Sequence, residues 1–115
     1  MSITRVTHVR LAEVLTKRPP PEGNLAAPVF AHGSLVVELY TPVGHDPQKP
    51  HKRDEVYFVA RGTGLFFGGS QRQAVQPGSF IFVPAGQVHR FEDFSPDFAV
   101  WVAFYGPEGG EPDDK

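Results

Sequence analysis

The chain has 115 residues, a formal net charge of −2 at pH 7 and no cysteine. This length fits a single domain, and the lack of cysteine excludes disulfides, thiolate metal sites and a cysteine nucleophile. The only basic clusters, at residues 17–19 and 51–53, form no basic stripe, which disfavours a nucleic-acid partner. Twelve glycines, twelve prolines and ten phenylalanines favour short strands joined by turns, and so predict an all-β protein.

Residues 1–22 are predicted to form an N-terminal arm and a proline connector outside the main domain. Residues 3–9 alternate well enough for a short strand, and residues 10–18 favour one or two helical turns before the prolines at 19–21. The arm lacks the apolar run of a signal peptide and nothing spans a membrane, so we expect a soluble cytoplasmic protein. Because three prolines hold an extended connector, the arm can cross onto a second copy, and we predict a homodimer.

Residues 23–107 are predicted to form one β-barrel domain. Strands are expected over residues 28–31, 34–41, 55–60, 65–67, 71–76, 79–83, 87–92 and 98–105. Short strands at such regular spacing are typical of an antiparallel sandwich or barrel. Residues 108–115 are polar and acidic, and we expect this tail to be disordered.

Polar side chains are expected on an inner face of the strand that contains residues 55–60. Alternate residues of an extended chain point to the same side, so His51, Glu55 and Tyr57 would share a face if the strand begins by residue 51. A buried, unpaired charge is strongly unfavourable, and a divalent metal would satisfy His51 and Glu55 together. His89 would add a second imidazole. Two imidazoles and one carboxylate favour non-haem iron(II), with manganese, nickel, zinc or copper as alternatives.

Two stretches of the chain resemble the two motifs of the cupin superfamily. The first motif, G(x)5HxH(x)3–4E(x)6G, is matched from its second histidine onward by His51, Glu55 and Gly62. The second, G(x)5PxGxxH(x)3N, is matched by Gly78, Pro84, Gly86 and His89, with Asp93 in place of the asparagine. The resemblance covers roughly residues 35–105. It implies a cupin-type jelly-roll β-barrel in which His51, Glu55 and His89 hold a divalent metal beside a small-molecule ligand.

The chain departs from the first motif at one position. The first histidine of the motif falls on Lys49, and a protonated lysine cannot be a metal ligand. His45 would replace it only if the loop folds inward, and Gln48 is a further candidate. We therefore expect three protein ligands, which still leaves room for a catalytic metal with waters completing its shell.

The resemblance implies a metal-dependent enzyme of dioxygenase, isomerase, decarboxylase or lyase type, acting on a small molecule in the barrel. Tyr57 or Glu38 would act as proton donor or acceptor, although Glu38 also fits a position at the rim or on the solvent face. Arg53 and Arg90 are interpreted as solvated side chains at the barrel mouth, with binding of an acidic substrate as the alternative.

Two other functions remain open from the sequence. The first is a non-catalytic barrel that binds a small ligand, for which Lys49 would place a positive charge near a carboxylate or phosphate. The second is a structural metal site in which the ion only fastens strands together. A transcription regulator is disfavoured because no helix-turn-helix segment accompanies the barrel.

Overall fold

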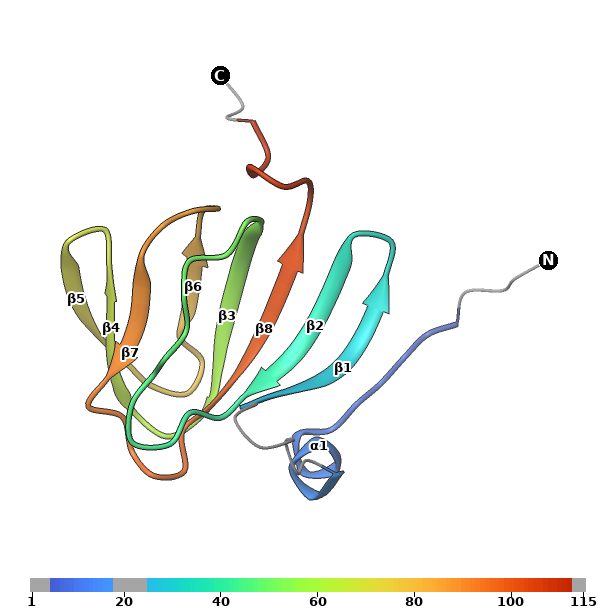
Figure 1. Cartoon of the computed structure of the whole chain (residues 1–115). Helices are drawn as coiled ribbons and strands as arrows, with labels where there is room; N and C mark the ends of the chain where they lie inside the picture. The colour runs from blue at the N-terminus through green and yellow to red at the C-terminus, as the bar shows by residue number, and fades with distance from the viewer. Residues whose placement is uncertain (1–4, 18–24, 113–115) are drawn as a thin grey trace.

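A computed structural model describes residues 5–17 and 25–112 (Figure 1). Within them lie one helix and eight strands. The elements are α1 Leu11–Lys17, β1 Ala26–His32, β2 Leu35–Tyr40, β3 Asp54–Arg61, β4 Gly64–Gly68, β5 Gln71–Val75, β6 Phe80–Val83, β7 His89–Glu92 and β8 Ala99–Tyr105. The predicted all-β class is confirmed, and each strand expected after residue 27 is present within a few residues of its predicted bounds.

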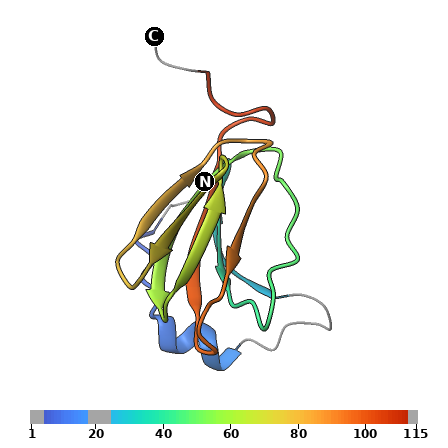
Figure 2. The ribbon, with the colours of Figure 1, turned by 90° about the vertical axis from the view of Figure 1, so that its left-hand side faces the viewer.

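The strands form two antiparallel sheets, seen in two orientations in Figures 1 and 2. The larger sheet has the order β1-β2-β8-β3-β6, and the smaller has the order β5-β4-β7. Their inner faces share one core of buried aromatic and branched side chains, which includes Tyr57, Val59, Phe91, Phe98 and Val100. This arrangement is a jelly-roll-like fold, as predicted. Sequence-distant strands become neighbours in it, so a side chain on β3 can approach one on β7.

Helix α1 covers only one part of the outer face of the larger sheet. Its Val14 packs with Ala27 of β1, Leu39 of β2 and Ala99 of β8. The predicted strand over residues 3–9 is wrong for residues 5–9, which have no strand structure and in which Val6 is fully exposed. Alternation alone does not make a strand where no neighbouring strand edge pairs with it. The proline connector at 19–21 lies outside the described residues.

Strand β3 begins at Asp54, next to its predicted start at residue 55, and it does not extend back to residue 51. The chain bends at Lys52 and Arg53, so His51 belongs to the preceding loop and not to the strand. From residue 55 the predicted alternation is correct: Glu55 and Tyr57 are buried, whereas Phe58 is exposed on the opposite face. His51 is anchored by its backbone, because its carbonyl accepts a hydrogen bond from the N–H of Gly86 at 2.7 Å.

The end of the chain folds back over the loop that carries His51. The N–H of Gly109 donates to the Lys52 carbonyl at 2.7 Å, and the N–H of Glu111 donates to the Asp54 carboxylate at 2.8 Å. Gly110 has a φ of +89°, and a Cβ there would lie 2.8 Å from Asp54 Oδ1, so this turn requires glycine. Gly109 and Glu111, expected to be part of a disordered tail, are therefore hydrogen-bonded to the barrel, and residues 113–115 lie outside the described part.

None of the helical structure found in residues 5–17 and 25–112 is long and apolar enough to cross a bilayer.

Candidate metal centre

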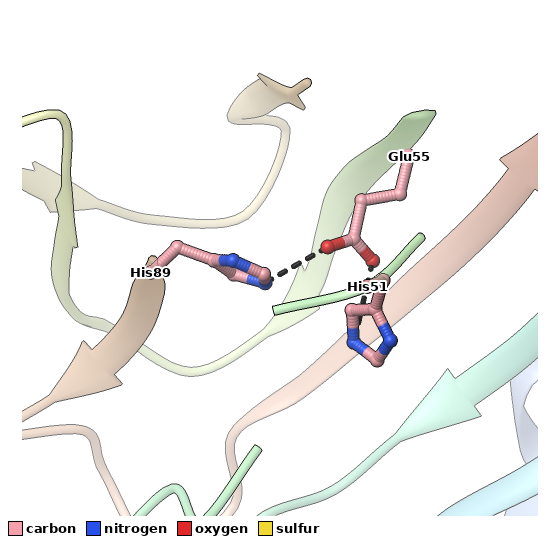
Figure 3. Close-up of side chains that lie close together, drawn as sticks. All are labelled: His51, Glu55 and His89. Carbon is pink, nitrogen blue, oxygen red and sulfur yellow. Dashed lines mark ion pairs between the residues drawn. The ribbon is translucent and has the colours of Figure 1, made fainter. Parts of the chain in front are cut away.

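The structure brings His51, Glu55 and His89 together inside the barrel (Figure 3). Nε2 of His89 lies 2.8 Å from Oε1 of Glu55, and Nε2 of His51 lies 3.9 Å from Oε2 of the same carboxylate. One ligand atom from each residue lies within 4.8 Å of the others. The three side chains thus converge on one point, as the sequence analysis expected.

Each of the three residues reaches this point from a different element. Glu55 stands on the inner face of β3 in the larger sheet and is only 1% exposed. His89 is the first residue of β7 in the smaller sheet and is also buried. His51 comes from the loop before β3, and its side chain keeps 35% of its surface exposed. The site therefore has two buried donors and one donor at the mouth, which leaves it a side open to solvent.

The imidazole of His89 is held in one tautomer by the backbone. Its Nδ1 lies 2.8 Å from the carbonyl oxygen of Gln87, which accepts only from a protonated ring nitrogen. In the neutral ring, Nε2 then carries a lone pair that faces the site, as a metal ligand requires. Burial alone lowers the pKa of His89, but Glu55 and the Gln87 carbonyl raise it, and the net pKa lies above its usual value.

The carboxylate of Glu55 lacks a satisfying partner. Both of its oxygens are buried, and neither receives a hydrogen bond of good geometry from the described residues. Nε2 of neutral His89 and Oε1 of Glu55 are both acceptors, so their 2.8 Å contact needs a cation between or beside them. A proton on His89 or a bound metal supplies that charge. Two imidazole nitrogens and a carboxylate suit divalent iron, manganese, nickel or zinc.

Tyr57 lies directly beside these ligand atoms. Its hydroxyl is 3.0 Å from Nε2 of His89 and donates a hydrogen bond to Oε1 of Gln48 at 2.8 Å. Burial, followed by the charge of Glu55, raises the pKa of Tyr57 well above its usual value, so the phenol keeps its proton. Tyr57, predicted as a weak catalytic candidate, is therefore placed where it can hydrogen-bond to a ligand in the site.

Glu38 faces the same interior from β2. It pairs with Val102 of β8, whose other neighbour is Tyr57, so the three side chains share the inner face. Burial raises the pKa of Glu38, whereas the charge of His51 lowers it and that of Glu55 raises it. This placement removes the alternative of a purely solvent-facing side chain. Glu38 is half-buried and within electrostatic range of His51 and Glu55.

The loop before β3 differs from its expected arrangement. Lys49, which occupies the motif's histidine position, is exposed, so the sequence argument for a positive charge in the pocket is removed. His45 is also exposed and does not belong to the group of converging ligand atoms. Gln48 instead turns inward, with Oε1 3.3 Å from Nε2 of His51. Gln48 was a candidate from the sequence, whereas Asp46, which holds it, was not, because its partners Phe91 and Tyr40 are distant in sequence.

The two arginines at the mouth are engaged with the protein. Nη1 of Arg53 donates to the carbonyls of Ser34 and Gly106, the latter at 3.2 Å. Arg90 pairs with Glu92 at 2.7 Å and lies over the ring of Phe67. Both side chains are partly exposed, and neither makes a described contact with the ligand atoms.

Comparison with known proteins agrees with this geometry. A family model described as "Cupin domain" matches residues 36–105. The uncharacterized protein SCO3923 of Streptomyces coelicolor is 46% identical over 63 residues, which are 55% of this chain and 60% of that protein. The match thus spans about three fifths of the length of this curated relative.

Two solved structures illustrate the likeness of the fold. A cupin-2 domain containing protein from Shewanella frigidimarina superposes with a TM-score of 0.67 at 15% identity, covering 85% of this chain and 94% of its own. The DMSP lyase DddQ from Ruegeria pomeroyi has a TM-score of 0.57 at 28% identity, covering 64% of this chain and 39% of its own.

Proposed function

The chain belongs to the cupin family, and from this premise we propose that it is a divalent-metal-dependent enzyme acting on a small molecule inside its barrel. One observation carries the proposal. The buried carboxylate of Glu55 faces the Nε2 lone pair of His89 at 2.8 Å, and no described hydrogen bond satisfies its oxygens. Such a buried arrangement requires a positive charge, from a proton on His89 or from a bound ion, and the nearby imidazole of His51 supports the ion.

His51, Glu55 and His89 would hold the ion, and three protein ligands leave positions for substrate. When bound, iron, manganese, nickel or zinc would polarise a substrate oxygen or activate a ligand at those positions. Tyr57 would orient the bound molecule by a hydrogen bond from its hydroxyl, and would hold or return a proton at that oxygen. Glu38, half-buried on the inner face of β2, is the second candidate for proton transfer.

The proposed reaction is of the dioxygenase, isomerase or lyase type. A cavity of about 190 Å³ reaches His89 and is lined by Phe66, Val83 and Gln87 among others, which fits a small molecule. The same fold hosts a lyase in DddQ, which supports the lyase class without identifying the substrate of this chain.

A structural metal site is the second candidate, and one observation favours it. Glu55 and His89 stand on different sheets, so an ion between them would fasten the two sheets together. The two functions differ in whether the ion keeps exchangeable water.

Water relaxation tests this difference directly. We expect Mn²⁺ added to the protein to be bound in a one-to-one ratio and to enhance the relaxation of solvent protons, because open positions exchange water with the bulk. The variants His51→Ala and His89→Ala should lose this bound Mn²⁺, whereas His45→Ala, which changes an exposed histidine of the same loop, should retain it. Tight Mn²⁺ binding without relaxation enhancement would favour the structural site and contradict the enzyme.

We also propose that the protein is a cytoplasmic homodimer. The outer face of the larger sheet carries a phenylalanine patch formed by Phe58, Phe80 and Phe82, which are 47%, 59% and 48% exposed. Phe58 and Phe80 are paired across β3 and β6, with ring centroids 5.2 Å apart. Exposed aromatic clusters of this kind mark association surfaces.

The proposed cytoplasmic location rests on the composition of the chain. The absence of cysteine fits a reducing compartment, and cell fractionation tests whether the protein is in the cytoplasm.

A further inference from the structure

The loop before β3 brings an amide oxygen, and not the Lys49 ammonium, to the metal centre. We propose that Gln48 is a fourth protein donor to the ion, through its side-chain Oε1, and that Asp46 is the positioning residue that fixes this oxygen toward the ion. The inference rests on the proposed metal site. The family motif has its fourth ligand, a histidine, at the position of Lys49, whereas the ligand proposed here is the preceding residue, Gln48.

The position of Gln48 follows from three contacts. Its Oε1 lies 3.3 Å from Nε2 of His51 and 2.8 Å from the hydroxyl of Tyr57. That hydroxyl is in turn 3.0 Å from Nε2 of His89. The amide oxygen therefore lies on the same side of the barrel as the imidazole nitrogens of His51 and His89.

The orientation of the amide is set by Asp46. Nε2 of Gln48 donates to Oδ2 of Asp46 at 2.6 Å, and the backbone N–H of Gln48 donates to Oδ1 at 3.1 Å. Rotating the amide by half a turn would place its oxygen against the carboxylate, where two acceptors repel. The carboxylate thus leaves Oε1 only one stable direction, which is toward the site.

Asp46 is itself held in place from two further directions. Oδ2 accepts the backbone N–H of Phe91 in β7 at 2.8 Å, and Oδ1 accepts the hydroxyl of Tyr40 in β2. These contacts connect the loop to one strand of each sheet. The donor at position 48 is therefore supported by the rigid part of the fold, as metal ligands usually are through their neighbours.

The sequence register explains why the motif misplaces the donor. Residues 49 and 51 would share a face in an extended strand, but Pro50 separates them and residues 47–51 form a loop. Lys49 is exposed, while Gln48 turns inward. A neutral amide oxygen in place of an imidazole gives two nitrogen and two oxygen donors. Such a set favours manganese or iron(II) over copper and zinc more than three imidazoles do.

Copper(II) is a sharp probe of this geometry, because pulsed electron paramagnetic resonance counts the imidazoles bound to it. We expect two coupled imidazoles in the wild-type protein. The variant Gln48→His should show three, because position 48 faces the ion, and the matched variant Lys49→His should still show two. Three imidazoles in Lys49→His and two in Gln48→His would overturn the inference and leave the metal site standing. Wild-type protein that binds neither copper(II) nor Mn²⁺ would overturn the proposed function itself.

A second measurement separates ligation from mere support of the loop. We expect Gln48→Leu to weaken Mn²⁺ binding about 10- to 100-fold, the range seen when a group that tunes a metal site is lost. Asp46→Leu should weaken it similarly in the wild-type background but add little in the Gln48→Leu background, because its effect passes through Gln48. Equal losses from Asp46→Leu in both backgrounds, or unchanged Mn²⁺ affinity in a folded Gln48→Leu protein, would overturn the inference.

Discussion

Oε1 of Glu55 and Nε2 of His89 lie 2.8 Å apart although they come from different sheets of the barrel. The Gln87 carbonyl fixes the proton of His89 on Nδ1, so the two facing atoms are both acceptors in the neutral state. The local chemistry of the site follows from this pair. A cation bound by both side chains would relieve the repulsion between these two acceptors.

Adding metal is expected to stabilise the fold through Glu55. At a free metal concentration one hundred times Kd, binding contributes about 2.7 kcal/mol, which raises Tm by roughly 10 °C in a domain of this size. The variant Glu55→Gln should lose this rise, because the amide cannot replace the anionic ligand. Differential scanning calorimetry with and without a chelator measures the metal-dependent rise in Tm of wild type and of Glu55→Gln. His45→Ala serves as the control that keeps the full rise. A Glu55→Gln protein with the wild-type shift would place the ion elsewhere.

Removing the hydroxyl of Tyr57 should separate chemistry from metal binding. In Tyr57→Phe we expect unchanged metal content, a loss of about 1 kcal/mol of unfolding free energy from the buried hydrogen bond, and turnover reduced about 10²- to 10⁴-fold. Elemental analysis and urea unfolding can be done before the substrate is known. Loss of the metal in this variant would show instead that the phenol is a ligand.

Asp54 is expected to hold the mouth of the barrel together. Its buried carboxylate accepts the N–H of Ala85 at 3.0 Å and that of Glu111 at 2.8 Å, and so joins the turn after β6 to the chain end. Asp54→Ala should cost about 1–3 kcal/mol of unfolding free energy, because both donors lose a charged partner. Asp54→Asn, which retains one acceptor oxygen, should cost less. Hydrogen exchange at Glu111 reports the release of the tail, and protection that persists in Asp54→Ala would contradict this role.

The pH dependence of stability should show the ion pairs of Glu92. The hydrogen bond from Arg72 at 2.7 Å, followed by that from Arg90, lowers the pKa of this carboxyl. A group with a lowered folded pKa stabilises the fold above its unfolded pKa, and this contribution is lost as pH falls through the folded value. We therefore expect chelator-treated Glu92→Gln to melt below wild type at pH 7, with a difference that disappears at acidic pH. A difference that is constant with pH would exclude an electrostatic cause.

The phenylalanine patch should control the oligomeric state. We expect wild-type protein to have twice the chain mass of 12.7 kDa in light scattering. Phe80→Glu should yield monomers, because it buries a charge in the apolar contact. Val43→Glu changes a residue that is 69% exposed and lies outside the patch, and it should remain dimeric. Dimers in Phe80→Glu, or monomers of wild type, would remove the patch from consideration.

The β3 residues show which parts of this structure the sequence could predict. The period of two along Glu55 and Tyr57 placed both side chains inward, and the turn residues marked most strand ends correctly. Periodicity fails where no sheet constrains the backbone. For that reason the alternation at residues 5–9 does not produce a strand, and the strand face of Glu55 and Tyr57 does not extend back to His51. These errors lie at the edges of regular structure.

The loop before β3 shows what could not be predicted. The inward turn of Gln48 depends on Asp46, and the place of Asp46 depends on Phe91 and Tyr40, which are distant in sequence. Such tertiary contacts have no local pattern. The burial of Asp54 has the same origin, because its partners Ala85 and Glu111 come from other parts of the chain.

Anomalous diffraction from crystals grown with manganese or iron tests the central claim most directly. We expect a single strong peak inside the barrel, within bonding distance of the ligand atoms of His51, Glu55 and His89. A map with no peak among these three side chains, from protein saturated with metal, would contradict it.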